Sequence, residues 1–132
     1  MKQQLSPGIS RILTEVVSRD KTASAVGSGL LDVYSTPSMI ALMEKTAADT
    51  VQNFLDNGEV TVGSEIHVHH RKASPIGTSI TCRARLEAIA DNKLTFVVEA
   101  YDKDRLIGDG RHVRHIVDRE RFMKKMLEKQ HE

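Results

Sequence analysis

The sequence predicts an α+β fold in which one long helix lies across a curled antiparallel sheet. Two observations carry this prediction: apolar residues recur with helical spacing between Ser35 and Asn57, and period-two strands separated by turn residues fill residues 59–117. Sequential hairpins make an antiparallel sheet, and such a sheet can leave one face free to receive a helix. We therefore expect a meander of four strands after the helix, within a single domain spanning residues 1–132.

The predicted helix has a clear beginning and a clear end. Thr36 followed by Pro37 indicates a hydroxyl N-cap and then proline at the first helical position, where its missing N–H is not needed. Asp56-Asn57-Gly58 provides the stop. Between them, an apolar stripe recurs at three- and four-residue steps: Ile40, Met43, Ala47, Val51 and Phe54.

The other elements follow from alternation and turn signals. Ser10–Val17 alternates enough to be a strand, and the small-residue segment Lys21–Leu31 is expected to be a loop or irregular strand that could cover a site. Asp118 is an N-cap candidate for a short amphipathic helix that ends the chain. The four strands of the meander are expected at Glu59–Lys72, Thr78–Ala90, Leu94–Tyr101 and Leu106–Val117.

The composition excludes several classes of protein. The formal net charge is +1, so no global field attracts nucleic acid or anionic membranes, and three Phe and two Tyr leave little for stacking bases. No apolar run approaches the roughly 20 residues of a membrane span, and the first ten residues lack the apolar core of a signal peptide. The single cysteine, Cys82, excludes an internal disulfide framework and suits a reducing compartment. A cytoplasmic, soluble protein is expected.

Glu44 breaks the pattern of the helix. It lies three or four positions from Ile40, Ala47 and Ala48, so it is expected to point with the apolar stripe. Because burying an unpaired carboxylate is costly, Glu44 is a candidate for a functional group. It could instead lie at the margin of the stripe, reach water or pair with a structural arginine.

Three histidines occur close together on one predicted strand. Because side chains alternate there, His67 and His69 share a face, and His70 faces the helix. His67 and His69 could be metal ligands only if His112 or His115 came near, so no metal site is expected. His70 needs a hydrogen-bond partner, which a buried carboxylate would provide, and it could equally be a satisfied core histidine.

Thr36 could also serve a function at the helix start, where free N–H groups and partial positive charge suit a developing oxyanion. If the helix is continuous, eight residues separate Thr36 from Glu44 by about 12 Å along its axis. Either the helix begins later, or the two residues meet different parts of one substrate, or the site is completed across subunits. Motifs such as GxSxG, CxxC and HExxH are absent from the sequence.

Four segments, STPSMIALMEKTA, TVGSEIHVHHRKASPIG, LTFVVEAYD and IGDGRHVRHIVDRERF, together resemble the fluoroacetyl-CoA thioesterase-like group of hotdog-fold thioesterases. The resemblance covers roughly residues 17–122. It implies a hotdog fold, a sheet wrapped around one long central helix, and an acyl-CoA thioesterase whose catalytic residues are Thr36, Glu44 and His70. It also implies that the backbone of Gly63 lies by the thioester, and Arg111 and Arg114 are candidate contacts for the site or for the phosphates of coenzyme A.

Further properties follow from this resemblance as expectations. It implies a homodimer, or a higher oligomer, with sheets joined edge to edge, and no cofactor other than the coenzyme A of the substrate. The fluoroacetyl-specific enzyme covers its site with phenylalanines on the segment before the catalytic threonine. The corresponding segment here, KTASAVGSGLLDVY, has no Phe, so another short or medium acyl group fits the sequence as well as fluoroacetyl does. The alternatives are a non-catalytic acyl-CoA-binding protein and an acyl-CoA hydratase, although no Asp–His pair typical of the hydratases is present.

Overall fold

The computed structural model describes residues 5–129. Its elements in chain order are β1 (Ser10–Val16), a 3₁₀ turn (Arg19–Lys21), α1 (Ala23–Val26), α2 (Thr36–Gln52), β2 (Glu59–His70), β3 (Ser79–Ala90), β4 (Lys93–Asp102), β5 (Arg105–Asp118) and α3 (Arg119–Lys129).

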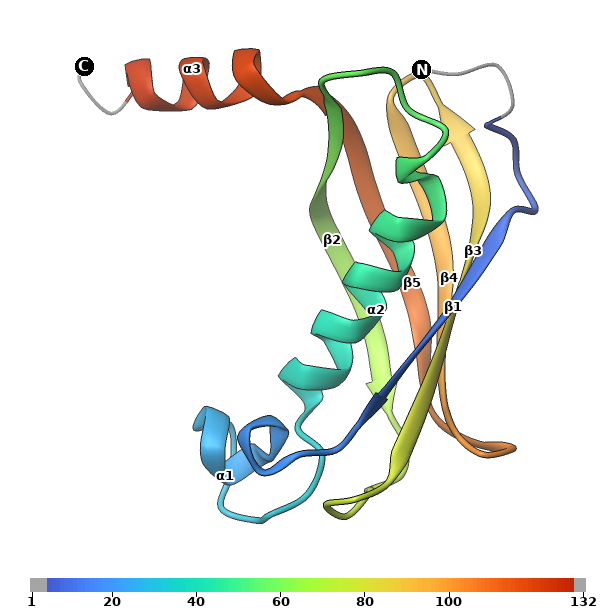
Figure 1. The fold of residues 1–132 in the computed structure, drawn as a ribbon, viewed down its shortest axis with the longest axis vertical. Coiled ribbons are helices and arrows are strands. Elements are labelled where there is room, and N and C mark those ends of the chain that lie inside the picture. Colours follow the sequence, from blue (N-terminus) through green and yellow to red (C-terminus); the bar gives the residue numbers. More distant parts are fainter. Residues whose placement is uncertain (1–4, 130–132) are drawn as a thin grey trace.

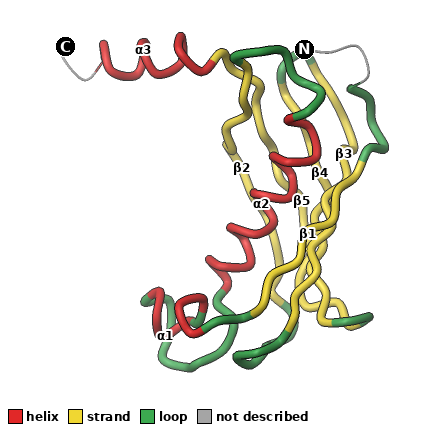
Figure 2. The backbone as a smooth tube through the Cα atoms, in the orientation of Figure 1, coloured by secondary structure: helices red, strands yellow, loops and turns green. Residues whose placement is uncertain are grey.

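One antiparallel sheet curls around the long helix α2, as the ribbon in Figure 1 and the backbone tube in Figure 2 show. The five strands have the order β1-β3-β4-β5-β2, and every neighbouring pair is antiparallel. The core lies between α2 and the concave face of the sheet, where Met39, Met43, Phe96 and Ile107 are fully buried. The predicted α+β class, with one helix held by a curled sheet, is confirmed.

The predicted meander is wrong in one connection. β2 pairs with β5 along its whole length, and β1 occupies the place beside β3 that a β2–β3 hairpin would have filled. The turn at residues 73–77 therefore leads from the edge strand β2 to β3, which lies next to the opposite edge strand β1. Local turn residues show where a strand ends but not which strand becomes its neighbour. As a result, β2 is an edge strand beside α2, and this places its residues at the functional site.

The buried face of α2 is rotated from the predicted stripe. Met39, Leu42 and Thr46 are buried, whereas Ile40 is only half-buried. Two buried threonines explain the shift: the hydroxyl of Thr46 donates to the carbonyl of Leu42, and that of Thr50 donates to the carbonyl of Thr46, both at 2.7 Å. A threonine whose hydroxyl bonds to its own helix can be buried at little cost.

Ser35, and not Thr36, caps α2. The Ser35 hydroxyl accepts a hydrogen bond from the backbone N–H of Ser38 at 3.1 Å, and Thr36 is already the first helical residue. The predicted cap was thus one residue too late. The correction matters because the Thr36 side chain is released from capping. The helix also ends earlier than predicted, at Gln52, and Gly58 forms the following turn with φ of +89°.

The segment before α2 contains short helices where a loop was predicted. The Thr22 hydroxyl caps α1 by accepting from the N–H of Ala25 at 3.3 Å, and Gly27 ends it in the left-handed conformation. Ser35 N–H donates to the Lys21 carbonyl at 3.0 Å. These bonds fix the beginning of α2 against the preceding segment.

The last helix, α3, begins as predicted, because the Asp118 carboxylate accepts a hydrogen bond from the N–H of Arg121 at 3.0 Å. It projects from the end of β5 beyond the edge of the sheet (Figure 1). Residues 130–132, which the sequence assigned to the same helix, lie outside the described part of the chain. No helix among residues 5–129 is long and apolar enough to cross a membrane.

Candidate active site

Thr36 and His70 meet at the beginning of α2. The hydroxyl oxygen of Thr36 lies 2.8 Å from Nδ1 of His70, which ends β2 thirty-four residues later. His70 does face the helix as predicted, although its partner is a threonine and not a carboxylate. The Tyr34 ring lies edge-on to the His70 ring at 6.3 Å between centroids, and its hydroxyl donates to the Glu15 carboxylate at 2.5 Å. His70 is therefore held between Thr36 and the ring of Tyr34, and Tyr34 is itself held by Glu15 of β1.

His70 is kept neutral by its surroundings. Burial lowers the pKa of its imidazole below the ordinary 6.5, and a backbone group of Lys72 acts in the opposite direction. Nε2 of His70 is buried and has no hydrogen-bond partner among residues 5–129. A neutral imidazole beside a hydroxyl can accept and return a proton. The pair is thus suited to proton transfer.

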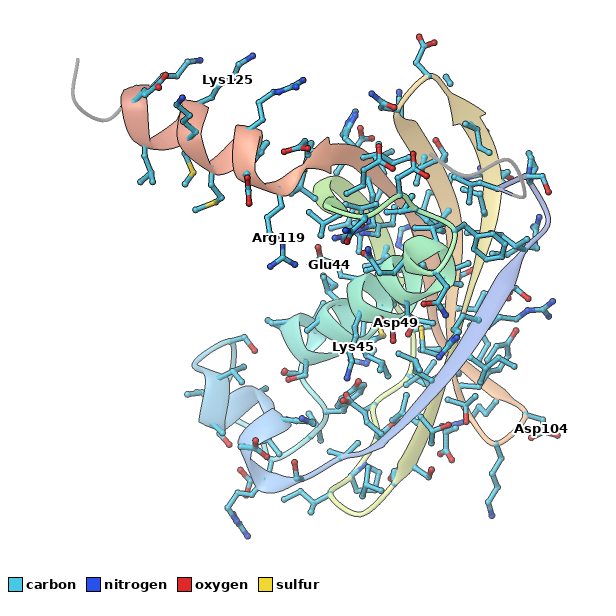
Figure 3. The ribbon with its side chains drawn as sticks, turned by 45° about the horizontal axis from the view of Figure 1, so that its top comes forward. Glu44, Lys45, Asp49, Asp104, Arg119 and Lys125 are labelled. Atoms are coloured by element: carbon cyan, nitrogen blue, oxygen red, sulfur yellow. The ribbon has the colours of Figure 1, made fainter. Side chains whose placement is uncertain are left out.

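Glu44 lies at the margin of the buried face of α2, as the second interpretation of the sequence allowed. Its side chain is 42% exposed, and Oε2 lies 3.7 Å from Nη1 of Arg114. In the view of Figure 3, Glu44 leaves α2 on the side of Arg119 and the start of α3, whereas Lys45 and Asp49 leave it elsewhere. The carboxylate is therefore both accessible to a ligand and held beside a cation.

Gly63 brings the backbone of β2 directly against Glu44. The pairing of β2 with β5 shifts by one residue between Gly63 and Glu65, so the predicted bulge is present. A Cβ atom at Gly63 would lie 2.8 Å from Oε2 of Glu44 and 3.2 Å from Nη1 of Arg114. Only glycine leaves room for the carboxylate in this position, so the predicted close approach is confirmed.

Arg114 is buried, with 8% of its surface exposed, and is bonded on three sides. Nε donates to the Thr61 hydroxyl at 2.7 Å, Nη2 to the Thr61 carbonyl at 3.0 Å, and Nη1 lies 3.0 Å from Nε2 of His112. Its guanidinium faces Glu44. The contact of Arg114 with the substrate stays a prediction. His112 was considered in the sequence only as a metal ligand. Its parity with Arg114 on β5 is a signal in the sequence from which both could have been placed on one face of the strand.

The structure separates the predicted catalytic residues into two groups. Thr36 and His70 form one group, and Glu44 with Gly63, His112 and Arg114 forms the other. Because α2 is continuous, eight residues separate Thr36 from Glu44, which is about 12 Å along the helix axis. Within one chain, Thr36 and Glu44 cannot contact the same atom.

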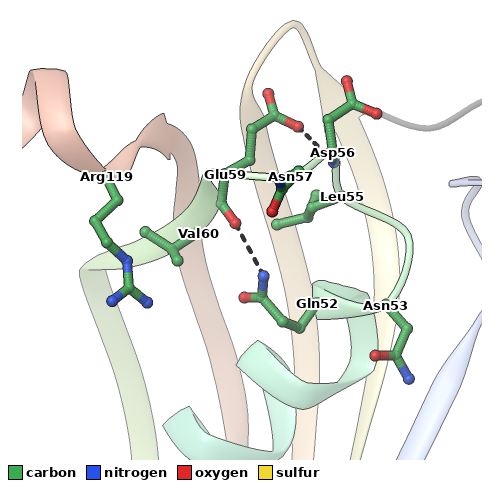
Figure 4. A pocket seen from close by; sticks show the side chains of 9 residues that line it. Gln52, Asn53, Leu55, Asp56, Asn57, Glu59, Val60 and Arg119 are labelled. Atoms are coloured by element: carbon green, nitrogen blue, oxygen red, sulfur yellow. Dashed lines mark hydrogen bonds between the residues drawn. The ribbon is translucent and has the colours of Figure 1, made fainter.

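A cavity of about 260 Å³ opens beside the first group. Its lining includes Thr36, His70 and Lys72, with the small side chains of Ala23 and Ser28 from the α1 segment. A larger hollow of about 720 Å³ lies at the other end of α2, where Gln52 donates to the Glu59 carbonyl at 2.9 Å (Figure 4). None of the predicted catalytic residues lines that hollow, whereas Thr36 and His70 both line the smaller cavity.

The remaining reactive side chains lie elsewhere. His67 and His69 contact each other on β2 with their rings 5.6 Å apart, and no cluster of three metal-ligating residues occurs in the described part of the chain. Arg111 pairs with Glu87. Cys82 lies in the core, where burial raises the pKa of its thiol to about 11.

Comparison with known proteins decides the family. The family model described as fluoroacetyl-CoA-specific thioesterase (FlK) matches residues 17–120. A fluoroacetyl-CoA thioesterase of Streptantibioticus cattleyicolor is 33% identical over 98 residues, which are 74% of this chain and 70% of that protein. The chain belongs to the fluoroacetyl-CoA-specific thioesterase family.

Solved structures agree with this family membership. A crystal structure of the fluoroacetyl-CoA thioesterase FlK superposes with a TM-score of 0.90 at 28% identity, covering 96% of this chain and 98% of that one. A thioesterase superfamily member from Thermus thermophilus superposes with a TM-score of 0.87 at 26% identity, over 98% of both chains. The hotdog fold is confirmed, and the protein is an acyl-CoA thioester hydrolase.

Proposed function

We propose that this protein hydrolyses a short or medium acyl-CoA thioester to the free acid and coenzyme A through Thr36, Glu44 and His70. The observation that carries the proposal is the 2.8 Å hydrogen bond between Thr36 and His70, two residues far apart in the sequence that meet beside a cavity. Coenzyme A enters only as part of the substrate, and no further cofactor is required.

We propose further that the site is completed in a homodimer, alone or within a higher oligomer. β2 is an edge strand, so the outer side of its backbone is available to a second copy. Antiparallel pairing of two β2 strands about a point between Ile66 and His67 places Gly63 opposite His70 of the second copy. That arrangement brings Glu44 of one copy toward Thr36 and His70 of the other. It removes the obstacle of 12 Å within one chain.

The chemistry of each group follows from its residue types. Water must attack the thioester carbonyl, the C–S bond must break, and the leaving thiolate must receive a proton. Glu44 acts as general base on the water or as a nucleophile that forms an acyl anhydride. His70 orients the reacting groups or protonates the thiolate, and Thr36 binds the carbonyl or the water. The backbone of Gly63 and the guanidinium of Arg114 lie against the Glu44 carboxylate and orient it.

The cavity at Thr36 and His70 indicates which acyl groups fit. The small side chains of Ala23, Ser28 and Val33 line it from the segment before α2, together with the buried ring of Tyr34. Small side chains leave space for acyl chains longer than acetyl. We therefore propose a short or medium acyl group, with fluoroacetyl, the substrate named for the relatives, as one candidate. The lone buried cysteine suits a cytoplasmic protein.

Hydrolysis of acetyl-, propionyl-, butyryl-, hexanoyl-, phenylacetyl- and fluoroacetyl-CoA, followed by thiol release, tests the proposal. Glu44→Gln should lower kcat by at least about a hundredfold, because it removes the carboxylate and keeps its size. Asp49→Asn is the matched control, since it makes the same change on the same helix, at a side chain that leaves α2 in another direction than Glu44 (Figure 3). It should leave kcat unchanged.

Three outcomes of this experiment are informative. Turnover of one panel member that disappears only in Glu44→Gln supports the proposed function and reports the size of the pocket. Wild-type rates in Glu44→Gln would remove Glu44 from the mechanism. Binding of the panel without any hydrolysis would identify a non-catalytic acyl-CoA-binding protein.

A further inference from the structure

His112 is a buried histidine that the proposed chemistry does not use. Only 1% of its surface is exposed, and it lies on β5 between the ring of Phe96 and the side chains of Glu44 and Arg114. Buried histidines need partners for both ring nitrogens. The identities of those partners decide which protonation state His112 can have.

The two hydrogen bonds of His112 are compatible with one form of the ring. Nδ1 lies 2.8 Å from the carbonyl oxygen of Glu65, which can only accept, so Nδ1 carries a proton. Nε2 lies 3.0 Å from Nη1 of Arg114, which can only donate, so Nε2 carries none. The ring is therefore the neutral Nδ1–H tautomer, and its 3.9 Å approach to the Glu44 carboxylate is not an ion pair.

This arrangement fixes the direction of the Arg114 guanidinium. Thr61 holds Nε and Nη2, and His112 holds one N–H of Nη1. Nη1 has one further N–H, and Oε2 of Glu44 lies 3.7 Å from this nitrogen. A guanidinium held at three nitrogens has little freedom to rotate away from the carboxylate.

We propose that His112 is a positioning residue, which acts as a hydrogen-bond acceptor to hold Arg114 against the Glu44 carboxylate. The inference rests on the proposed function for the role of Glu44, but the tautomer on which it depends belongs to the free protein. The bond to Glu65 adds a second effect, since it ties the histidine to the bulge that brings Gly63 to Glu44. His112 therefore connects β2, β5 and the catalytic carboxylate.

The surroundings of His112 keep it neutral near pH 7. Burial, first, and the charge of Arg114 lower its pKa below the ordinary 6.5, whereas the Glu65 carbonyl and the Glu44 carboxylate act in the opposite direction. Phe96 contributes no charge from β4. Protonation at acidic pH would remove the acceptor and place a second cation beside Arg114. Activity should therefore be lost as the pH falls through the lowered pKa.

Two variants of similar shape separate the acceptor from the packing. In His112→Gln, the amide oxygen can take the place of Nε2 and accept from Arg114. In His112→Asn, the shorter amide can still donate to the Glu65 carbonyl but cannot reach Arg114. We expect kcat within about threefold of wild type for His112→Gln and about tenfold to a hundredfold lower for His112→Asn, at unchanged KM. As the pH falls below 6.5, protonation of His112 should lower the rate of the wild-type protein. His112→Gln lacks this imidazole, so the acid side of its pH–rate profile should involve one protonation fewer.

A merely structural role would give a different result. It predicts that kcat follows the melting temperature in both variants, and that outcome, or a fully active His112→Asn, would overturn the proposal. Long-range proton–nitrogen correlation spectra of the wild-type protein at pH 7 provide the second measurement, with His112→Gln assigning the signal. They should show the Nδ1–H tautomer, and a protonated or Nε2–H ring would contradict the inference. If no acyl-CoA is hydrolysed, the proposed function fails, while these spectra still decide the state of His112.

Discussion

At the scale of single residues, two adjacent hydroxyls at the start of α2 have different tasks. Ser35 caps the helix, whereas Thr36 turns its side chain to His70. Either residue could have been the cap by type, because serine and threonine are both favoured there. The position of the first helical turn decides between them, and it frees the Thr36 hydroxyl to bond to His70.

Thr36→Val and Ser35→Ala should therefore have opposite effects. Thr36→Val keeps the shape of the side chain but removes the bond to His70, so we expect kcat to fall by about a hundredfold at nearly unchanged stability. Ser35→Ala should cost about 1 kcal/mol of stability through the lost cap and leave kcat close to wild type. Steady-state kinetics and thermal unfolding of both variants check this. Equal loss of kcat in the two variants would contradict separate roles.

At the scale of elements, the bulge in β2 places the backbone of Gly63 against Glu44. An unbroken strand would keep the side chains in strict alternation and would not bend the backbone toward α2 at this point. The bulge lies beside Arg114, its partner on β5. The site therefore depends on how β2 pairs with β5, a pairing of two distant segments.

Gly63→Ala should reduce activity more than stability. Its Cβ would lie 2.8 Å from Oε2 of Glu44, the mobile end of a side chain, so the carboxylate moves and the backbone remains. We expect kcat to fall about tenfold or more, with thermal unfolding close to wild type. Gly58→Ala is the control: it meets no atom within 4 Å, but its φ of +89° disfavours a side chain. It should cost about 1 kcal/mol and leave kcat intact. An active Gly63→Ala would exclude the close approach as a requirement.

At the scale of the whole molecule, the two groups of site residues lie at different heights along α2, and β2 forms one edge of the sheet. A second copy added at that edge offers one solution to both facts. It would cover the exposed backbone of β2 and supply the missing group to each site. In that case each site is complete only in the dimer, so a measurement of the oligomeric state also tests whether the site is complete.

Complementation between inactive variants tests this shared site. If Thr36 of one copy works with Glu44 of the other, a mixed dimer of Thr36→Val and Glu44→Gln contains one intact site and one with both defects. Random exchange of equal amounts should recover about a quarter of wild-type activity. If each chain holds its own complete site, no activity returns. The single variants, unfolded and refolded alone, provide the baseline.

The sequence by itself determined α2, the five strands and α3, and it gave the family resemblance from which five site residues are predicted. Helical spacing placed α2, alternation placed the strands, and the inward parity of His70 was correct, because each of these depends on neighbours within a few positions. Only the tertiary structure decided that β2 pairs with β5, that Ser35 is the cap, and that His112 holds Arg114. These three features depend on which distant segments pack together, and the pattern of neighbouring residues does not specify that packing. The separation of Thr36 from Glu44 depends on both sequence and structure. The sequence predicted it from the length of the helix, and the continuous α2 shows that the two side chains lie apart within one chain.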